Sequence, residues 1–224
     1  MMTNLFSTFD PATSMNYSMN WMSTIIMLMI MPYSYWMMPN RITVIMNLVT
    51  EKLHSEFKTL LGNKSEGMTL ILISLFMFIL INNFMGLMPY IFTSSSHLVF
   101  SLTMALPLWL GMMIFGWYKN TNSMFAHLVP NGTPTMLMPF MVMIETISNI
   151  IRPGSLAVRL TANMIAGHLL MSLLGNKSIN SMNITLMIIM VIQVMLMMFE
   201  AAVAVIQAYV FSVLTTLYTS EVMH

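Results

Sequence analysis

The apolar residues of this chain form long runs separated by short polar segments. The first run, at 21–38, lies in a stretch without any charged residue between Asp10 and Arg41. Because a helix rises about 1.5 Å per residue, this run is long enough for one membrane span. The next run, 68–118, carries no charge and is divided by a polar cluster at 93–97. It therefore predicts a transmembrane helical hairpin.

Residues 41–62 follow a different pattern, in which apolar residues recur every three or four positions and charged residues lie between them. The apolar positions are Ile42, Ile45, Val49, Leu53, Phe57 and Leu60, and the charged ones are Glu51, Lys52, Glu56 and Lys58. This pattern predicts an amphipathic helix at the membrane interface. The alternative is a soluble amphipathic helix packed on another domain, and we favour it less because the sequence contains no other soluble domain.

The last part of the chain, 136–220, is expected to form two long helices. The stretch 136–174 is marked by a Pro-Gly pair at Pro153, and 184–219 contains neither Gly nor Pro. Each helix would be on the order of 55 Å long, whereas the hydrocarbon layer is roughly 30 Å thick. Either each helix breaks, or both lie strongly tilted as an antiparallel pair joined through 175–183. We favour the tilted pair.

The composition agrees with a membrane protein. Of 224 residues, 58% are hydrophobic and 7% are charged, whereas about 25% are charged in a typical soluble domain. The formal net charge of +1 offers no basic surface for nucleic acid. The chain has no cysteine, which excludes disulfides and cysteine-ligated metals. Without internal repeats or a flexible linker, we expect one all-α polytopic membrane domain over 1–224.

The distribution of basic residues predicts the orientation in the membrane. With five embedded stretches, Lys177 falls on one side and the other basic loop residues fall on the opposite side, which should be the matrix or cytoplasm. Those residues are Arg41, Lys52, Lys58, Lys64 and Lys119. The N-terminus is then outside and the C-terminus inside. No Lys or Arg precedes Arg41, so we expect neither a secretory signal nor a transit peptide. The 32 methionines fit a mitochondrial code in which an AT-rich codon also specifies Met.

Charged and amide side chains recur at seven-residue intervals, or twice that, inside both long apolar stretches. One embedded charge costs about 2.5–3.5 kcal/mol at mid-span, so such residues are expected to have a function. A seven-residue interval drifts only about 20° around a helix, so each set lines one face. These residues are Glu145, Arg152 and Arg159 in the first stretch, and Gln193, Glu200, Gln207 and Glu221 in the second.

The chemistry of these side chains suggests different roles. Counting from a turn near Ile179 places Arg159 within about one helical turn of Glu200. A guanidinium keeps its proton, so Arg159 can repel cations or pair with a carboxylate but cannot relay protons. The glutamates and His168 can titrate. His168 lies about 180° around the helix from Arg159 and should serve a different path.

Structural roles are the alternative for several of these residues. Arg159 and Glu200 would form a buried ion pair within the hairpin, and His168 would satisfy a neighbouring carbonyl. Arg152, just before a proline, would have a structural role. Asn163 and Gln207 would hydrogen-bond between helices. The sequence contains no phosphate-binding Gly loop, H-E-x-x-H motif or plausible Ser/His/Asp set, so we expect no active site, cofactor or metal in this chain alone.

The segment 155–168, with the sequence SLAVRLTANMIAGH, closely resembles the signature of subunit a of F-type ATP synthases in its animal mitochondrial form. The segments IETIS at 144–148 and EAAVAVIQAYVF at 200–211 extend the resemblance, as do the opening residues. It covers the whole chain. The resemblance implies a first span, a surface helix, a hairpin and two steeply tilted helices beside a rotating ring of c subunits.

The resemblance also implies roles for the embedded residues. Arg159 would face the ring carboxylate, draw off its proton and block a leak between two offset half-channels. Glu200 and His168 would line the path from the intermembrane space, and Glu145 with Glu221 the path to the matrix. Two further polar residues, Asn163 and Gln207, would lie near Arg159.

The implied partners are the c-subunit ring, the peripheral stalk, other membrane-sector subunits, the lipid bilayer and protons. The implied location is the mitochondrial inner membrane, with the N-terminus in the intermembrane space and the C-terminus in the matrix. A self-contained channel would need charges on several spans, but those before Lys119 carry none. A purely structural assembly subunit is disfavoured by the embedded Arg159.

Overall fold

The computed structural model describes residues 5–14, 17–32, 36–62, 67–129, 134, 136–179 and 181–223, and across these ranges the elements are helical. In chain order they are η1 (Leu5–Phe9), η2 (Met19–Trp21), α1 (Met22–Met29), α2 (Arg41–Leu61), α3 (Met68–Gly86), η3 (Ser94–Ser96), α4 (Leu98–Lys119), α5 (Thr121–Leu128), α6 (Met138–Ile179) and α7 (Asn183–Met223). The prediction of an all-α membrane protein is confirmed.

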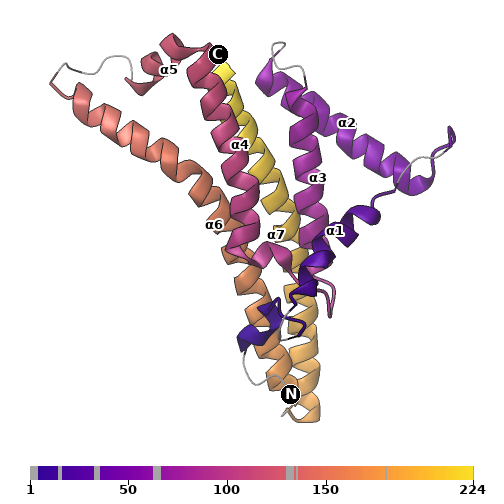
Figure 1. The fold of residues 1–224 in the computed structure, drawn as a ribbon. Helices are drawn as coiled ribbons and strands as arrows, with labels where there is room; N and C mark the ends of the chain where they lie inside the picture. The colour runs from indigo at the N-terminus through magenta and orange to yellow at the C-terminus, as the bar shows by residue number, and fades with distance from the viewer. Residues whose placement is uncertain are drawn as a thin grey trace.

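Four helices are long and apolar enough to cross a membrane among the described residues: α3, α4, α6 and α7. The predicted hairpin therefore appears as α3 and α4, joined through η3. These two helices pack mainly on the two long helices: α3 contacts α7, and α4 contacts α6. The hairpin thus supports both long helices, as Figure 1 shows.

The structure shortens the first predicted helix. α1 covers only Met22–Met29, and the described residues 30–32 and 36–38 are not helical. Residues 33–35, in the predicted run, lie outside the described residues. Pro32 explains the end of the helix, because its ring clashes with the carbonyl four residues earlier and disfavours helical geometry at the preceding residue. The prediction of a helix through residue 38 overlooked this proline.

Helices α6 and α7 contain 42 and 41 residues and are continuous. Each is therefore roughly 60 Å long. The alternative in which each long stretch breaks is wrong. The two helices lie side by side at their shared hairpin end and separate toward the other end, where α6 diverges from α4 and α7 (Figure 1).

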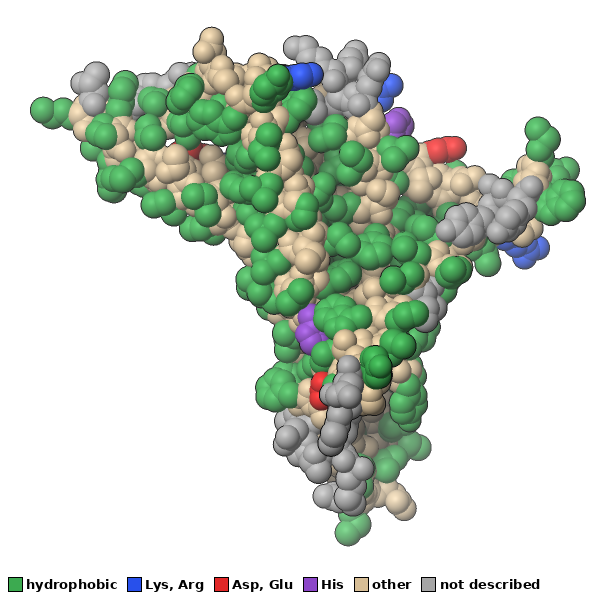
Figure 2. All heavy atoms as spheres, viewed as in Figure 1, with side chains coloured by type: hydrophobic (Ala, Val, Ile, Leu, Met, Phe, Trp, Pro, Cys, Tyr) green, Lys and Arg blue, Asp and Glu red, His purple; other side chains and the backbone are tan. Residues whose placement is uncertain are grey.

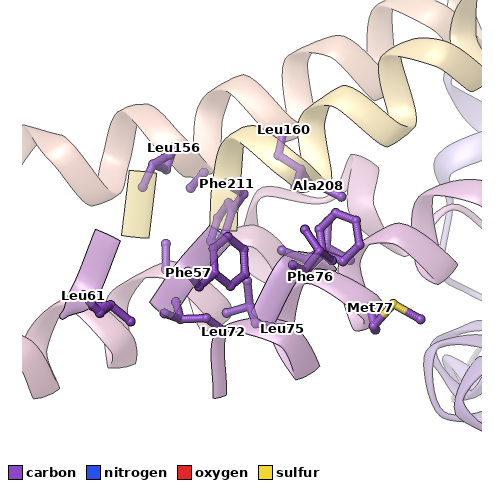
Figure 3. Close-up of a cluster of buried hydrophobic side chains, with 14 residues drawn as sticks. Phe57, Leu61, Leu72, Leu75, Phe76, Met77, Leu156, Leu160, Ala208 and Phe211 are labelled. Atoms are coloured by element: carbon purple, nitrogen blue, oxygen red, sulfur yellow. The ribbon is translucent and has the colours of Figure 1, made fainter. Parts of the chain in front are cut away.

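A cluster of buried apolar side chains joins α2, α3, α6 and α7 (Figure 3). Phe57 of α2 is completely buried within it. The C-terminal half of α2 thus packs on the other helices, whereas apolar side chains in its N-terminal half, such as Ile42 and Ile45, remain exposed. The cluster also contains Leu61, Leu72, Leu75, Phe76, Leu156, Ala157, Leu160, Ala208 and Phe211.

The outer surface of the molecule is mainly apolar. Figure 2 shows one face on which hydrophobic side chains predominate and charged side chains are few. On α7, apolar residues four positions apart, such as Met187, Val191 and Met195, are more than half exposed. In water such a surface would be unfavourable, but in a bilayer these side chains can contact lipid.

Candidate functional site

The predicted site residues lie on α6 and α7, which run antiparallel and bring residues from distant parts of the sequence together. Five of them come from α6, namely Glu145, Arg152, Arg159, Asn163 and His168, and four come from α7, namely Gln193, Glu200, Gln207 and Glu221. The structure separates most of them into two cavities and leaves Arg159 between them.

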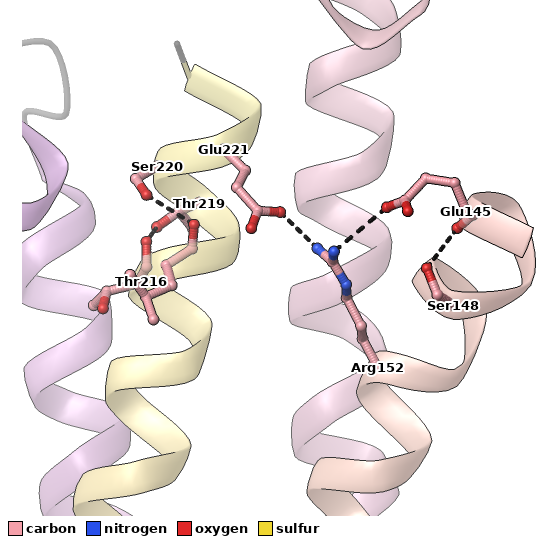
Figure 4. A network of polar contacts seen from close by, with 8 residues as sticks. Glu145, Ser148, Arg152, Thr216, Thr219, Ser220 and Glu221 are labelled. Carbon is pink, nitrogen blue, oxygen red and sulfur yellow. Dashed lines mark hydrogen bonds and ion pairs between the residues drawn. The ribbon is translucent and has the colours of Figure 1, made fainter. Parts of the chain in front are cut away.

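Arg152 is the centre of the first group (Figure 4). Its Nη1 donates to Oε2 of Glu221 on α7 at 2.6 Å, and its Nη2 lies 3.5 Å from Oε1 of Glu145 on α6. The guanidinium also lies over the ring of Tyr218, 4.9 Å from its centroid. The sequence predicted that Glu145 and Arg152 share a helix face, and the structure adds that Arg152 links both carboxylates.

These three side chains line a cavity of about 470 Å³, here named the Arg152 cavity. It lies where α6 diverges from α4 and α7, and α4 and α5 also contribute to its wall, with Trp109 and His127 among the lining residues. The side chains of the ion-pair network are 26–52% exposed. A polar cavity of this size has room for several water molecules.

The second group lines a cavity of about 600 Å³ between α6 and α7, here named the Glu200 cavity. Glu200 is only 8% exposed, and its Oε1 is buried without a hydrogen-bond partner among the described residues. The Nε2 atom of His168 is likewise buried without a hydrogen-bond partner among these residues. Unpaired buried polar atoms are costly, so this cavity is suited to polar solvent or to a proton. Asn163 and Gln207 also line it.

Gly167 makes room for the carboxylate of Glu200. A Cβ atom added at Gly167 would lie 2.7 Å from Oε1 and 2.8 Å from Cδ of Glu200. The sequence reasoning missed this residue as a site residue. The available signal was a glycine inside a long helix, where it costs about 1 kcal/mol relative to alanine and so needs a reason.

Arg159 belongs to neither cavity. Its side chain is exposed, and among the described residues it has no hydrogen bond or ion pair. The buried Arg159–Glu200 pair considered from the sequence is therefore absent. The predicted register was also wrong, because Glu200 lies against Gly167, eight residues or about 12 Å along α6 from Arg159. The turn lies between Ile179, the last residue of α6, and Asn183, the first residue of α7, so it comes later in the chain than a turn near Ile179 and shifts the register in this direction.

Tightly packed apolar side chains separate the two cavities. Leu156, Ala157 and Leu160 of α6 are at most 5% exposed, and they pack with Ala208 and Phe211 of α7 (Figure 3). The two cavities have no lining residue in common. The interior of the chain therefore contains an apolar barrier at the level where Arg159 faces outward.

Gln193 is the one predicted residue of the α7 stripe that lines neither cavity. It is partly exposed and lies closer to the hairpin end of α7 than Glu200 does. The seven-residue spacing predicted its helix face, but the described cavity begins at Leu196.

A buried polar cluster next to α6 and α7 was not anticipated as such. The segment 93–97 was used only to divide the hairpin, yet Ser95 is completely buried and η3 packs against α6. Asn82 and Asn83 of α3 are also buried, and Nδ2 of Asn83 donates to the carbonyl of Ala204 at 3.5 Å. Two adjacent amides inside an apolar helix were the missed signal, since burying them requires hydrogen-bond partners.

A family model and individual relatives identify the same family for this chain. The chain matches the family model of the ATP synthase A chain over residues 17–220. The ATP synthase subunit a of Aedes aegypti is 61% identical over 99% of this chain and all of its own length. The subunits a of Locusta migratoria and Drosophila melanogaster are each 60% identical, again over 99% of this chain and all of their own length.

Proposed function

The chain belongs to the ATP synthase A chain family, the proton-translocating subunit of the membrane sector, and we propose that its two cavities are offset proton half-channels kept apart by Arg159. Its relatives are ATP synthase subunits a of insects, and four of its described helices are long and apolar enough to span a membrane, which supports a multi-pass protein of the mitochondrial inner membrane.

The observation that carries this proposal is the position of Arg159. The side chain is exposed on α6, has no partner among the described residues, and lies at the level of the apolar barrier between the cavities. An unpaired cation within a membrane is costly, so a carboxylate from outside the chain is its expected partner. The proposed source is the ring of c subunits, which would pass this face of α6.

The proposed proton path begins in the Glu200 cavity, which would open to the intermembrane space. Glu200 and His168 are the titratable side chains that line this cavity, and they would pass the proton to a ring carboxylate. A neutralised carboxylate can move into lipid, whereas an ionised one is attracted to Arg159. Because the two paths are offset, a proton can cross only by travelling with the ring.

The proposed path ends in the Arg152 cavity, which would open to the matrix. Glu145 and Glu221 together carry two negative charges, and Arg152 compensates one of them. The remaining negative charge favours acceptance of a proton from the ring. Each proton that crosses releases about 2.3 kcal/mol per 100 mV, which the offset between the paths converts into rotation.

The proposed topology places the two ends of the chain on opposite sides of the membrane. In Figure 1, η1 lies beside the lower part of α6 and α7 ends at the top, which supports opposite sides for the two ends; the proposed sides are the intermembrane space for the N-terminus and the matrix for the C-terminus. Within one membrane domain, we propose that 21–38 contains the first crossing, 41–62 lies at the interface, 68–118 is the hairpin and 136–220 is the tilted pair. The peripheral stalk and other membrane-sector subunits would cover surfaces not facing the ring.

A sided labelling experiment tests the two half-channels. Because the chain has no cysteine, Val203→Cys in the Glu200 cavity, Asn149→Cys in the Arg152 cavity and Ala208→Cys in the barrier each add a single thiol. An impermeant thiol reagent should inhibit Val203→Cys only from the intermembrane side and Asn149→Cys only from the matrix side. Ala208→Cys is the matched control and should resist both. Inhibition of either cavity variant from both sides would contradict separate half-channels.

A further inference from the structure

The 3-10 turn η1 packs against α6 beside the Glu200 cavity. The ring of Phe9, the last residue of η1, lies perpendicular to the imidazole of His168, with an interplanar angle of 86° and 6.3 Å between centroids. Figure 1 shows this N-terminal segment lying along the lower part of α6. A segment from the start of the chain therefore contacts a titratable residue of the proposed proton path.

The two phenylalanines of η1 have different surroundings. Phe6 is 69% exposed, whereas Phe9 is partly buried and contacts His168. The turn thus places the ring of Phe9 against His168 and leaves the ring of Phe6 exposed. Phe6 is accordingly a control of the same residue type in the same element.

The residues after Phe9 fix the position of the turn. Oδ1 of Asp10 accepts a hydrogen bond from the amide of Ala12 at 3.0 Å, and the carbonyl of Asp10 accepts one from Nδ2 of Asn20 at 3.3 Å. Trp21 then packs on the ring of His97, with 5.2 Å between centroids. Phe9 is therefore held from both the turn and the folded segment that follows it.

We propose that Phe9, which contacts His168 and is not itself a lining residue of the Glu200 cavity, is a positioning residue for His168. Perpendicular aromatic contacts are favourable and directional, so the ring of Phe9 restricts rotation of the imidazole. It keeps one ring nitrogen directed to a fixed place and covers an edge that water would otherwise reach. The inference rests on the proposed role of His168 in proton transfer.

One titratable side chain shares the cavity with His168, and one charged residue adjoins Phe9 in the sequence. Glu200 lines the same cavity from α7, and Asp10 directly follows Phe9 on the N-terminal segment. The direct contact of the turn with the imidazole is made by Phe9, an uncharged ring. The carboxylate of the next residue, Asp10, instead accepts a hydrogen bond from the amide of Ala12. The effect of Phe9 should therefore depend on an aromatic ring and not on charge.

The test compares Phe9→Leu, Phe9→Tyr and Phe6→Leu in the assembled ATP synthase. Phe9→Leu should lower ATP synthesis at a fixed proton-motive force by about two- to tenfold, matching the strength of one aromatic pair. Phe9→Tyr keeps an aromatic ring and should synthesise ATP at the parent rate, and so should Phe6→Leu. In parallel, diethyl pyrocarbonate should modify His168 faster in Phe9→Leu, measured on the peptide, while modification of His97 stays unchanged.

A normal rate of synthesis together with unchanged modification of His168 in assembled Phe9→Leu would overturn the inference. If that variant does not assemble, Phe9→Met keeps much of the side-chain volume without a ring and carries the same comparison. His168→Gln distinguishes the proposed proton path from the proposed positioning role of Phe9. If His168→Gln leaves synthesis unchanged, the proposed path fails; if it slows synthesis while Phe9→Leu does not, only the positioning role fails.

Discussion

The substitution Gly167→Ala tests whether the position of the Glu200 carboxylate matters for proton transfer. The added Cβ would lie 2.7 Å from Oε1, 2.8 Å from Cδ and 3.1 Å from Cγ of Glu200. Restoring an ordinary contact of 3.4 Å requires the carboxylate to move by about 0.7 Å. The moving atoms are at the flexible end of a side chain, so the backbone of α7 can stay in place.

The expected effect on stability is small and the expected effect on activity is large. Overpacking costs about 1–3 kcal/mol, while replacing Gly by Ala within a helix stabilises it by about 1 kcal/mol. The net loss of about 0–2 kcal/mol should leave the complex assembled. Because proton transfer depends steeply on geometry, with losses of about 100-fold for a 1 Å displacement in enzymes, ATP synthesis should fall on the order of tenfold.

The assay is ATP synthesis per assembled complex at a fixed proton-motive force. Gly175→Ala is the matched control in the same helix, because a Cβ at Gly175 meets no atom within 4 Å. Adding Glu200→Asp to Gly167→Ala shortens the acidic side chain and should recover part of the rate. A normal rate in assembled Gly167→Ala would refute the argument that this glycine positions the carboxylate.

Three further predictions concern the Arg152 cavity and the packing of the helices. Arg152→Gln removes both ion pairs and should slow ATP synthesis severalfold with assembly preserved; an unchanged rate would exclude a role for this network in proton release. Gly116→Ala brings a Cβ within 2.7 Å of a methyl group of Val222 and should lower stability by about 1–3 kcal/mol, seen as faster proteolysis of the C-terminus. Gly111→Ala in the same helix meets no such atom and should match the parent protein. Phe57→Ala empties a completely buried site and should cost about 3–5 kcal/mol, so normal amounts of heat-stable complex would contradict the proposed core.

The long helices were predictable because their signal is local. Uninterrupted apolar stretches and a seven-residue spacing of polar side chains are properties of neighbouring residues, and α6 and α7 follow them. The end of α1 was equally local, but Pro32 was overlooked. Local signals thus predicted which residues share a helix face.

The partners of those residues depend on how the helices meet. The spacing placed Glu145 and Arg152 on one face, yet only packing of α6 on α7 brings Glu221 to Arg152. The register of the two helices, which the sequence pattern does not determine, places Glu200 against Gly167 instead of near Arg159. The contact between Phe9 and His168 joins residues far apart in the sequence, and no periodic pattern predicts such a contact.

The central claim is that Arg159 prevents protons from passing directly between the two cavities. The most direct measurement is passive proton leak together with ATP synthesis in membranes with assembled Arg159→Gln complex, compared with Arg41→Gln, which removes an exposed guanidinium at the start of α2. We predict that Arg159→Gln abolishes synthesis and raises the leak, while Arg41→Gln does neither. Assembled Arg159→Gln complex that synthesises ATP at the normal rate without added leak would contradict the claim.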